Sequence, residues 1–515
     1  MRPLLVGLLA FAAAAVITLR DGAPRPVYHD ELAYLLAADT FAHGRLAMPA
    51  HPHWRHFESF HVLHQPTYAS KYPPGQGLLL ALGQRLGSPI VGVWLGVAAM
   101  CGAMTWMLGG YLPSRWSVLG GALAVVQVAL LSYWSGSYWG GALGAFGGAL
   151  VFGALPRIVR SRPGRVAWAS PLVLAIGLLV LANTRPFEGA LVSLAAGLPL
   201  VVWLARAELR RTRWLRVAVP MLAVLGLGFA AMGWYNVAVT GHPLRIPYSV
   251  HNQAYLVQPL FVLQPLRPVP EYRHEILRRY FAEFEVRELQ SQQSLAGWAS
   301  TRLRRLERSR AILLGPVLTL PMLLVPCAWR LRGVRLAIAG LALLLVSMAV
   351  TMHHYAHYAA PVLPLVLLVV VQGWRIVIVA AARRGVRRGV LMAAVVGAAL
   401  VSRLAIPDPV LRVGAARSAN RAKASIERYL EDQGGRHLVF VHHGPFADVH
   451  DEWVWNGADI DSRPIVWARA MMPGADGALR SYYGDRRAWR VDIAVERPGM
   501  VDLVELTDTT AAPER

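Results

Sequence analysis

Lysine, cysteine and acidic residues are scarce in this 515-residue chain, and these shortages limit the classes of protein to which it can belong. Only two lysines occur, Lys71 and Lys423, so nearly all of the net charge of +22 comes from arginine. The two cysteines, Cys101 and Cys327, both lie inside apolar segments, which excludes a disulfide framework. Charged residues make up 16% of the chain and hydrophobic residues 55%, which is more apolar than an ordinary soluble domain.

The apolar residues come in runs of about 16 to 24, the length that a bilayer-spanning helix needs. Residues 4–19 are short enough for a signal peptide, but no small-residue cleavage site follows them, so we predict a first span there. The expected fold class is an all-α polytopic membrane protein with interfacial helices in its outer loops. We predict about eleven spans, at residues 4–19, 89–111, 116–134, 139–155, 167–183, 188–205, 217–236, 311–328, 336–352, 359–382 and 389–405.

Arginines cluster in every second short loop, and this pattern predicts the orientation. Cytoplasmic loops carry the excess of Lys and Arg in membrane proteins, so the N-terminus is expected in the cytoplasm. The same assignment places all 17 histidines on the outer side. Because the arginines follow the loops, we expect no nucleic-acid partner. The clusters lie at residues 157–165, 206–216, 330–335 and 383–388.

Three longer regions then lie outside an inner (cytoplasmic) membrane: loop 20–88, loop 237–310 and the C-terminal stretch. We predict a transmembrane domain over residues 1–405 and a small α/β extracytoplasmic domain over residues 406–515. Within the latter, residues 418–433 predict a helix, and 437–442, 464–468 and 488–494 predict strands. An arginine cluster at 302–310 predicts an interfacial helix on anionic lipid, or a surface that gathers an anionic lipid substrate.

Loop 20–88 opens with two carboxylates, Asp30 and Glu31, about ten residues after the first apolar run. Acids at this position would lie at the membrane surface. Further along, Lys71 and Tyr72 precede Pro73-Pro74, which fix the backbone just before a helix. Lysine serves as a point charge for phosphate, so Lys71 is a candidate contact for a lipid phosphate. The alternative is an interfacial lysine that reaches toward the head groups.

Histidines are frequent in the same loop, and they raise the question of a divalent metal. Imidazole and carboxylate groups bind zinc or manganese. The spacing matches no compact metal-binding motif, so no metal site is assigned and a divalent metal remains an open alternative. Possible additional site residues are His53, His56, Glu58 and His61.

Two short outer loops contribute further candidates for substrate binding. Arg185 and Glu188 lie at membrane depth, where charged residues either bind a substrate or pair with each other. The segment His353, His354, Tyr355, Ala356, His357 and Tyr358 either forms an aromatic belt or lines a site. If this segment is helical, His353 and His357 share a face and point at one ligand.

The order of these features resembles the C-type fold of membrane glycosyltransferases, in particular the group of aminoarabinose transferases and protein O-mannosyltransferases (glycosyltransferase family 39-like). The motif-level resemblance lies in residues 28–34 and 70–77. Such enzymes take a sugar from a polyprenyl-phosphate carrier and invert its anomeric centre. The resemblance implies Asp30 as general base, Glu31 as its neighbour and Lys71 as a phosphate contact.

The sequence therefore predicts a glycosyltransferase that moves a hexosyl or pentosyl unit from a polyprenyl-phosphate donor to an acceptor outside the membrane. The acceptor is a lipid, a glycan or a protein. A carboxylate that takes the acceptor's proton suits this reaction, and positive charge stabilises the leaving phosphate. Two alternatives are a transporter or flippase of lipid-linked sugars and a non-enzymatic envelope assembly protein. A transporter is expected to place polar groups in mid-span.

Overall fold

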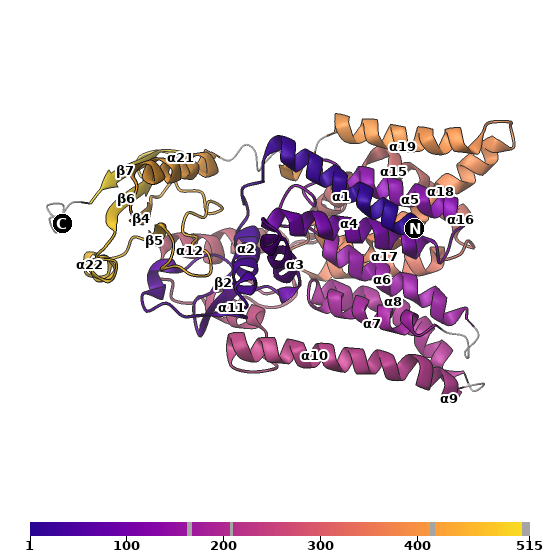
Figure 1. Ribbon diagram of the computed structural model, residues 1–515, viewed down its shortest axis with the longest axis horizontal. Helices are drawn as coiled ribbons and strands as arrows, with labels where there is room; N and C mark the ends of the chain where they lie inside the picture. Colours follow the sequence, from indigo (N-terminus) through magenta and orange to yellow (C-terminus); the bar gives the residue numbers. More distant parts are fainter. Residues whose placement is uncertain (162–166, 207–209, 407, 412–417, 507–515) are drawn as a thin grey trace.

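The computed structural model describes residues 1–161, 167–206, 210–406, 408–411 and 418–506. Figure 1 shows a bundle of long helices at one end and a smaller region with a β-sheet at the other, where the C-terminus lies. The bundle consists of apolar helices, which satisfy their own backbone hydrogen bonds as a lipid environment requires. These helices are α1 (Arg2–Asp21), α4 (Pro89–Leu108), α5 (Ser114–Ala124), α6 (Ala142–Val159), α7 (Ala169–Ala182), α8 (Pro186–Ala205), α10 (Val219–Thr240), α17 (Val334–Val350), α18 (Leu363–Ala382) and α19 (Arg388–Ala405).

Seven helical segments in the described part of the chain are long and apolar enough to cross a membrane. The chain is thus a multi-pass membrane protein with a mostly helical fold, as predicted. The predicted number of about eleven spans is not confirmed. Helices α7 and α17 are apolar but shorter, and α5 passes after 11 residues into a π-helix at Val125–Ala129.

The eighth predicted span is not one straight helix. Helix α14 (Leu295–Leu313) carries the arginine cluster, and the chain bends by 108° directly after it. Gly315 has a φ of +58° at this bend. Pro316, Pro321 and Pro326 follow, and each removes a backbone donor that a continuous helix needs.

The two long outer loops fold into short helices and a small sheet between the bundle and the C-terminal region. In the three-stranded sheet β3 is central, with the order β1-β3-β2. The first loop contains α2 (His29–Ala42), β1 (Met48–Pro49), a 3-10 helix (Trp54–Phe57), β2 (Val62–Leu63), β3 (Thr67–Ser70) and α3 (Pro74–Arg85). The second contains α11 (Pro247–Tyr255), α12 (Glu275–Arg278), the π-helix Arg279–Phe284 and α13 (Glu285–Gln290).

The C-terminal region contains a four-stranded sheet in the order β5-β4-β6-β7. Strand β4 pairs in parallel with β5 and β6, and β7 is antiparallel to β6. The predicted helix and three strands are confirmed, whereas β7 has no counterpart among the predictions. The elements are α21 (Ser418–Gln433), β4 (His437–His443), β5 (Ile465–Arg469), α22 (Pro473–Tyr482), β6 (Arg487–Ile493) and β7 (Val501–Glu505).

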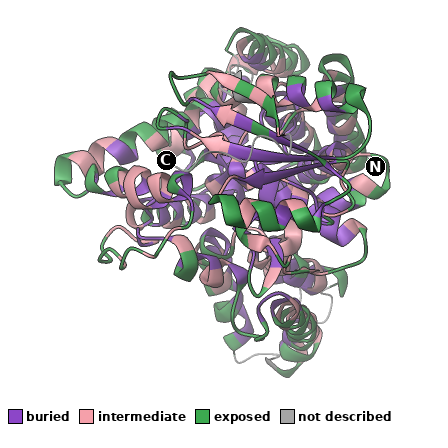
Figure 2. Ribbon diagram, turned by 90° about the vertical axis from the view of Figure 1, so that its left-hand side faces the viewer, coloured by how far each residue is buried: buried purple, intermediate pink, exposed green. Residues whose placement is uncertain are grey.

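This sheet shares its hydrophobic cores with the outer loops. Side chains of a strand alternate between its two faces, so Leu438 and Phe440 of β4 face one way and Val439 the other. The first two pack in one cluster with Leu36 of α2. Val439 packs in a second cluster with Phe281 of the second outer loop. Figure 2 shows the resulting purple strands in the middle of the molecule, covered on both sides.

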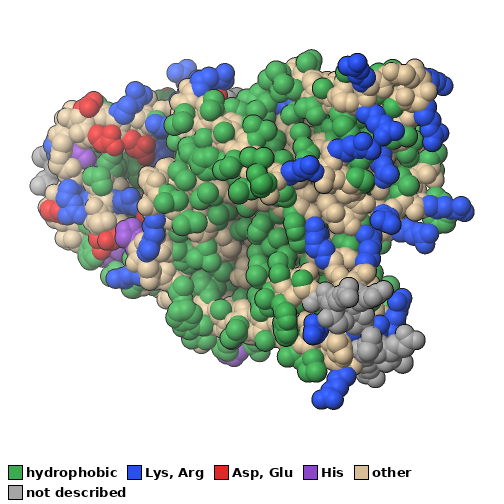
Figure 3. Space-filling view, turned by 45° about the vertical axis from the view of Figure 1, so that its right-hand side comes forward, with side chains coloured by type: hydrophobic (Ala, Val, Ile, Leu, Met, Phe, Trp, Pro, Cys, Tyr) green, Lys and Arg blue, Asp and Glu red, His purple; other side chains and the backbone are tan. Residues whose placement is uncertain are grey.

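Acidic side chains gather at one end of the molecule. Figure 3 shows a band of hydrophobic side chains over the helices; in this view the charged side chains at one end are Lys and Arg, whereas the other end carries Asp, Glu and His together with Lys and Arg. The arginine-rich end is the one expected to face the cytoplasm. Residues 162–166 and 207–209, which belong to two of the predicted cytoplasmic loops, lie outside the described residues.

The orientation gives a first prediction. Single cysteines at Arg160 and Arg384 should react only after the membrane is permeabilised, because both positions are exposed at the arginine-rich end. Cysteines at Gln65, Leu263 and Phe446, which are exposed at the other end, should react in intact cells. A membrane-impermeant maleimide in a cysteine-free background measures this. Labelling of position 446 only after permeabilisation would contradict the orientation.

Candidate active site

The first turn of α2 positions Asp30. Tyr28 caps this helix, and a carboxylate in the first turn is favoured by the helix dipole. The hydroxyl of Tyr72 donates a hydrogen bond to Oδ1 of Asp30. Burial, together with the charge of Asp30, raises the pKa of Tyr72 well above its usual range, so this hydroxyl keeps its proton. Asp30 is only half-buried and remains accessible to a second hydrogen-bond donor.

Glu31 has a different role from its neighbour. It is buried, and its Oε2 accepts backbone N–H groups from Val27 at 2.7 Å and Tyr28 at 3.1 Å. Its Oε1 accepts the N–H of Tyr138 at 2.9 Å. Burial raises the pKa of Glu31 to about 6, although these three hydrogen bonds oppose the shift. Glu31 therefore joins the start of α2 to the loop between the π-helix Val125–Ala129 and α6, and both of its oxygens accept hydrogen bonds from the protein itself.

We expect Glu31→Gln to act mainly on stability. The new amide nitrogen would meet a backbone N–H instead of accepting from it, which leaves a buried donor unpaired. Such a group costs about 1–3 kcal/mol. Thermal melts of the purified variant should show a lowered midpoint. An unchanged midpoint with lost activity would indicate instead that Glu31 acts directly in chemistry.

Lys71 is buried beside Asp30, with 5% of its surface exposed. Its Nζ lies 2.8 Å from Nδ1 of His61, and 5.2 Å from the ring centres of both Tyr72 and Tyr248. Burial lowers the pKa of Lys71 to about 8, against the opposing charges of Asp30 and Glu285. Lys71 is therefore a cation at neutral pH with few protein partners for its charge.

His61 holds Lys71 in this position. It is buried, and burial next to Lys71 lowers the pKa of His61 well below its usual range. The ring is thus neutral, and its Nδ1 accepts a hydrogen from the ammonium group. The backbone N–H of Lys71 also donates to the carbonyl of His61, at 3.1 Å. Of the four additional candidates predicted from the loop, His61 is the one that lies beside Asp30 and Lys71.

A close backbone contact brings Arg185 to the same place. The N–H of Gly75 donates to the carbonyl of Asn183 at 2.9 Å. A Cβ at Gly75 would lie 2.5 Å from that oxygen, so only glycine permits the contact. A small cavity follows, lined among others by Tyr34, Gln76 and Arg185. Three segments that are distant in sequence thus meet at this cavity: the first outer loop, residues 140–144 and residues 184–185.

Arg185 and Glu188 do not form the ion pair that was the alternative to substrate binding. The guanidinium carbon of Arg185 lies 4.4 Å from the ring centre of Tyr358, a cation–π contact. In the part of the chain that the structure describes, no ion pair within 4 Å joins Arg185 to Glu188. Glu188 is buried in the first turn of α8. Arg185 and Tyr358 therefore form one unit of the site.

The histidines at 353 and 357 do not share one helix face. A 3-10 helix begins only at Ala356, so His353 lies before it. His353, Tyr355 and His357 stack instead, with ring centres 6.4 and 5.7 Å apart. His353 contacts Gln258 at 2.9 Å and His357 contacts Tyr133 at 3.0 Å. The helical spacing argument is wrong here because the segment is not helical.

His354 is buried on the other side of this segment. Its burial, together with nearby arginines, lowers the pKa of His354 to about 3, so the ring is neutral. Its Nδ1 has no hydrogen-bond partner among the described residues. His354 is therefore an uncharged residue that packs against Tyr358, with the two ring centres 5.6 Å apart.

The other three additional candidates lie away from Asp30. His56 contacts Asp476 at 3.2 Å, and the ring of His53 lies 5.1 Å from that of Tyr482, so both contact the C-terminal region. Glu58 lines a separate cavity. Within the described ranges, no group of three or more His, Cys, Asp or Glu side chains is arranged to hold a metal ion.

Residues of the second outer loop and of α14 also lie close to the site. Tyr248 lies against Lys71. Glu285 is buried, with Oε1 3.7 Å from Nε2 of His353, and Arg305 approaches from α14, where it pairs with Glu288 at 3.2 Å. Arg305 belongs to the arginine cluster for which the sequence predicts a contact with anionic lipid. No motif marks Tyr248 or Glu285, so only the three-dimensional fold reveals these two.

The helical bundle, the acid-bearing first loop with its short helices and the C-terminal sheet together have the arrangement of the C-type fold. No protein-family profile and no curated protein matches the sequence. Among solved structures, ArnT from Cupriavidus metallidurans in the apo state is similar, with a TM-score of 0.56 and 12% identity over 98% of this chain and 99% of that one. ArnT bound to undecaprenyl phosphate gives 0.56 and 13% over the same shares.

An oligosaccharyltransferase from Archaeoglobus fulgidus, solved with zinc and sulfate, has a TM-score of 0.48 and 11% identity over 96% of this chain and 68% of its own. At such identities the likeness to ArnT concerns the fold. It confirms the fold resemblance predicted from the sequence, and the coverage shows that the outer loops and the C-terminal sheet take part in it as well as the membrane helices.

Proposed function

We propose that this protein is an inverting glycosyltransferase that moves a sugar from a polyprenyl-phosphate-linked donor to an acceptor on the outer face of the inner membrane. Two neighbouring contacts carry the proposal: the hydrogen bond from Tyr72 to Asp30 and the contact of Lys71 with His61. A partly exposed carboxylate and a buried cation lie together at the end of the helical bundle that we expect to face outward. A general base and a phosphate-binding group are what this reaction requires.

In the proposed reaction, a hydroxyl or amine of the acceptor attacks the anomeric carbon of the sugar. The bond from this carbon to the phosphate oxygen breaks, and its electron pair leaves with the phosphate. Asp30 takes the proton of the attacking group. Attack from the face opposite the leaving phosphate inverts the anomeric centre. Since the leaving group is already an anion, it needs positive charge rather than a proton.

Lys71 is the group proposed to bind that phosphate. Of the two lysines in the chain, only Lys71 lies beside Asp30. His61 orients its ammonium group through the 2.8 Å contact. Arg185 lines the small cavity described above and would supply a second cation. The ArnT structure with undecaprenyl phosphate supports a polyprenyl carrier, because that protein shares this fold.

Transfer from a defined donor tests the proposal. The purified full-length protein in lipid nanodiscs is given undecaprenyl-phosphate-linked pentoses and hexoses, with a lipid or glycan extract of the envelope as acceptor. We expect time-dependent release of undecaprenyl phosphate and a glycosylated product of inverted configuration. Movement of the donor across vesicle membranes without cleavage would show a flippase instead, and binding without either event would show an assembly protein.

The pKa of Lys71 predicts a pH dependence. A lysine with a pKa of about 8 is charged below this pH and neutral above it. The kcat/KM for the donor should therefore be constant between pH 6.5 and 7.5, and should fall about tenfold per pH unit above roughly pH 8. Lys71→Arg should remove this fall, because arginine keeps its charge. A wild-type profile that stays flat to pH 10 would contradict phosphate binding by Lys71.

A further inference from the structure

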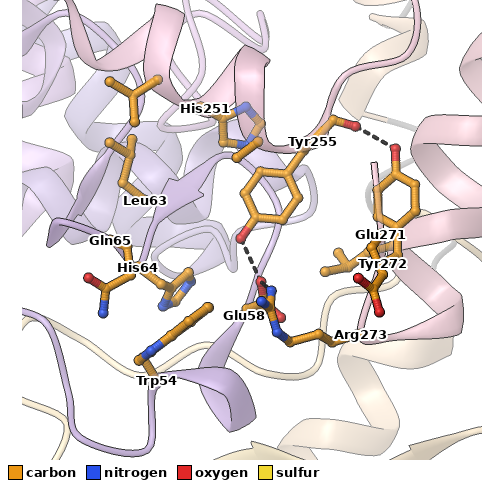
Figure 4. A pocket seen from close by; sticks show the side chains of 13 residues that line it. Trp54, Glu58, Leu63, His64, Gln65, His251, Tyr255, Glu271, Tyr272 and Arg273 are labelled. Carbon is orange, nitrogen blue, oxygen red and sulfur yellow. Dashed lines mark hydrogen bonds and ion pairs between the residues drawn. The ribbon is translucent and has the colours of Figure 1, made fainter. Parts of the chain in front are cut away.

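A cavity of about 110 Å³ opens between the two long outer loops, apart from Asp30. Figure 4 shows its lining, with Trp54 and Glu58 from the first loop and His251 and Tyr255 from α11. Buried side chains form its floor, and the exposed Arg273 lies at its rim. A cavity of this form on the outer side has access to ligands from solvent and is not needed for the proposed chemistry at Asp30.

Glu58 provides an unused acceptor in the cavity. It is 2% exposed, and its Oε1 accepts from the hydroxyl of Tyr255 at 2.8 Å and from Arg273 at 3.4 Å. Its Oε2 has no hydrogen-bond partner among the described residues. His274 lies 3.5 Å from this oxygen, but the same Nε2 contacts the carbonyl of Arg55 at 2.7 Å. A buried carboxylate oxygen without a donor is costly, so a ligand in the cavity that donates a hydroxyl or amine hydrogen to the Glu58 carboxylate would be favoured.

The remaining lining favours a sugar over an anion or a lipid chain. Trp54, Tyr255 and Tyr272 supply aromatic surface, and the guanidinium of Arg273 lies 4.8 Å from the ring centre of Trp54. Glu58 and Glu271 together outweigh the single charge of Arg273, which disfavours phosphate. Aromatic faces and a few polar groups provide apolar contact and fixed hydrogen bonds. A saccharide ring, with its C–H face and its hydroxyl groups, can use both.

The cavity shares a wall with the candidate active site. His251 lines it, and the His251 ring lies 5.8 Å from that of His61, which holds Lys71. The imidazole rings of His251 and His61 thus lie between the cavity and Lys71. We infer that the cavity binds a saccharide unit, and that this unit belongs to the acceptor, the second half resting on the proposed function.

Binding is tested without turnover. Methyl α-glucoside, methyl α-mannoside and methyl β-N-acetylglucosaminide are offered to the full-length protein in nanodiscs, and saturation-transfer NMR detects bound sugar. We expect at least one of them to bind. Trp54→Ala should weaken it about tenfold or more, since a stacked aromatic face is lost. The exposed Arg273→Ala should weaken it also, and Phe446→Ala, an exposed aromatic outside the cavity, should leave it unchanged.

Three results would overturn the saccharide site: no probe binds, binding survives both cavity variants, or inorganic phosphate displaces the sugar. Loss of binding in Lys71→Ala would place the sugar in the donor site and would equally overturn it. The transfer assay separates the two proposals. If the proposed function holds, Trp54→Ala should raise the KM for the acceptor and leave that for the donor unchanged. Saccharide binding without any transfer by the wild type would refute the proposed function alone.

Discussion

Sugar transfer should fall by about 10²- to 10⁴-fold in Asp30→Asn, the range that a positioned general base contributes. Asparagine keeps the size of the side chain and still accepts the hydroxyl of Tyr72, so the local contacts persist. What it loses is the ability to take a proton from the acceptor. Product formation from the undecaprenyl-phosphate-linked donor measures this, with donor affinity measured separately in the same preparation.

Asp21→Asn is the matched control for Asp30. Asp21 ends α1 on the same side of the bundle, is exposed and pairs with its neighbour Arg20. Surface changes of this kind are usually within about 0.5 kcal/mol, so transfer and stability should both be unchanged. Tyr72→Phe keeps the ring and removes the hydrogen bond to Asp30, and we expect an intermediate loss. Full activity of Asp30→Asn would show that another group takes the proton.

Lys71→Ala should raise the KM for the donor or lower kcat/KM by roughly 10- to 150-fold, while the acceptor dependence stays nearly unchanged. A charge-assisted hydrogen bond contributes about 1.5–3 kcal/mol, which corresponds to that range. Arg185→Ala should act in the same direction. Because both cations would bind one phosphate, the double variant should lose less than the sum of the two single changes. Donor titrations of the three variants measure this.

Lys423, the second of only two lysines, provides the control. It lies in α21, where its Nζ donates to the carbonyl of Trp453 at 2.8 Å and contacts the ring of Trp467. Lys423→Ala should lower the melting temperature without changing the donor KM. If instead Lys71→Ala lowers only stability and leaves donor kinetics intact, Lys71 has no contact with the phosphate.

Much of the architecture can be read from the sequence, because long apolar runs and arginine-rich loops are strong local signals. The helix at 418–433 and the strands of the C-terminal sheet also follow from local patterns. Breaks inside apolar stretches are harder to predict. The bend after α14 depends on Gly315 and the following prolines, and the passage of α5 into a π-helix has no sequence signal of its own.

The site is predictable in part. Asp30 and Lys71 lie in the first outer loop and Arg185 in a short loop far along the chain, and the structure brings these two loops side by side. The sequence cannot distinguish Asp30 from Glu31, because their roles depend on which one turns toward three backbone N–H groups. Nor does it indicate Glu285, whose relation to Lys71 arises from the packing of the second outer loop.

The cores that join α2 to strand β4 have a consequence for how the protein is made. Leu36 and Phe440 pack in the same cluster although about four hundred residues separate them in the chain. Such long-range contacts form late, and a chain is synthesised from its N-terminus. The first outer loop, including Asp30 and Lys71, therefore lacks part of its hydrophobic core while the intervening helices are synthesised. The hydrophobic cluster that holds α2 is complete only when strand β4 has joined it, so the C-terminal region finishes the packing around the first outer loop.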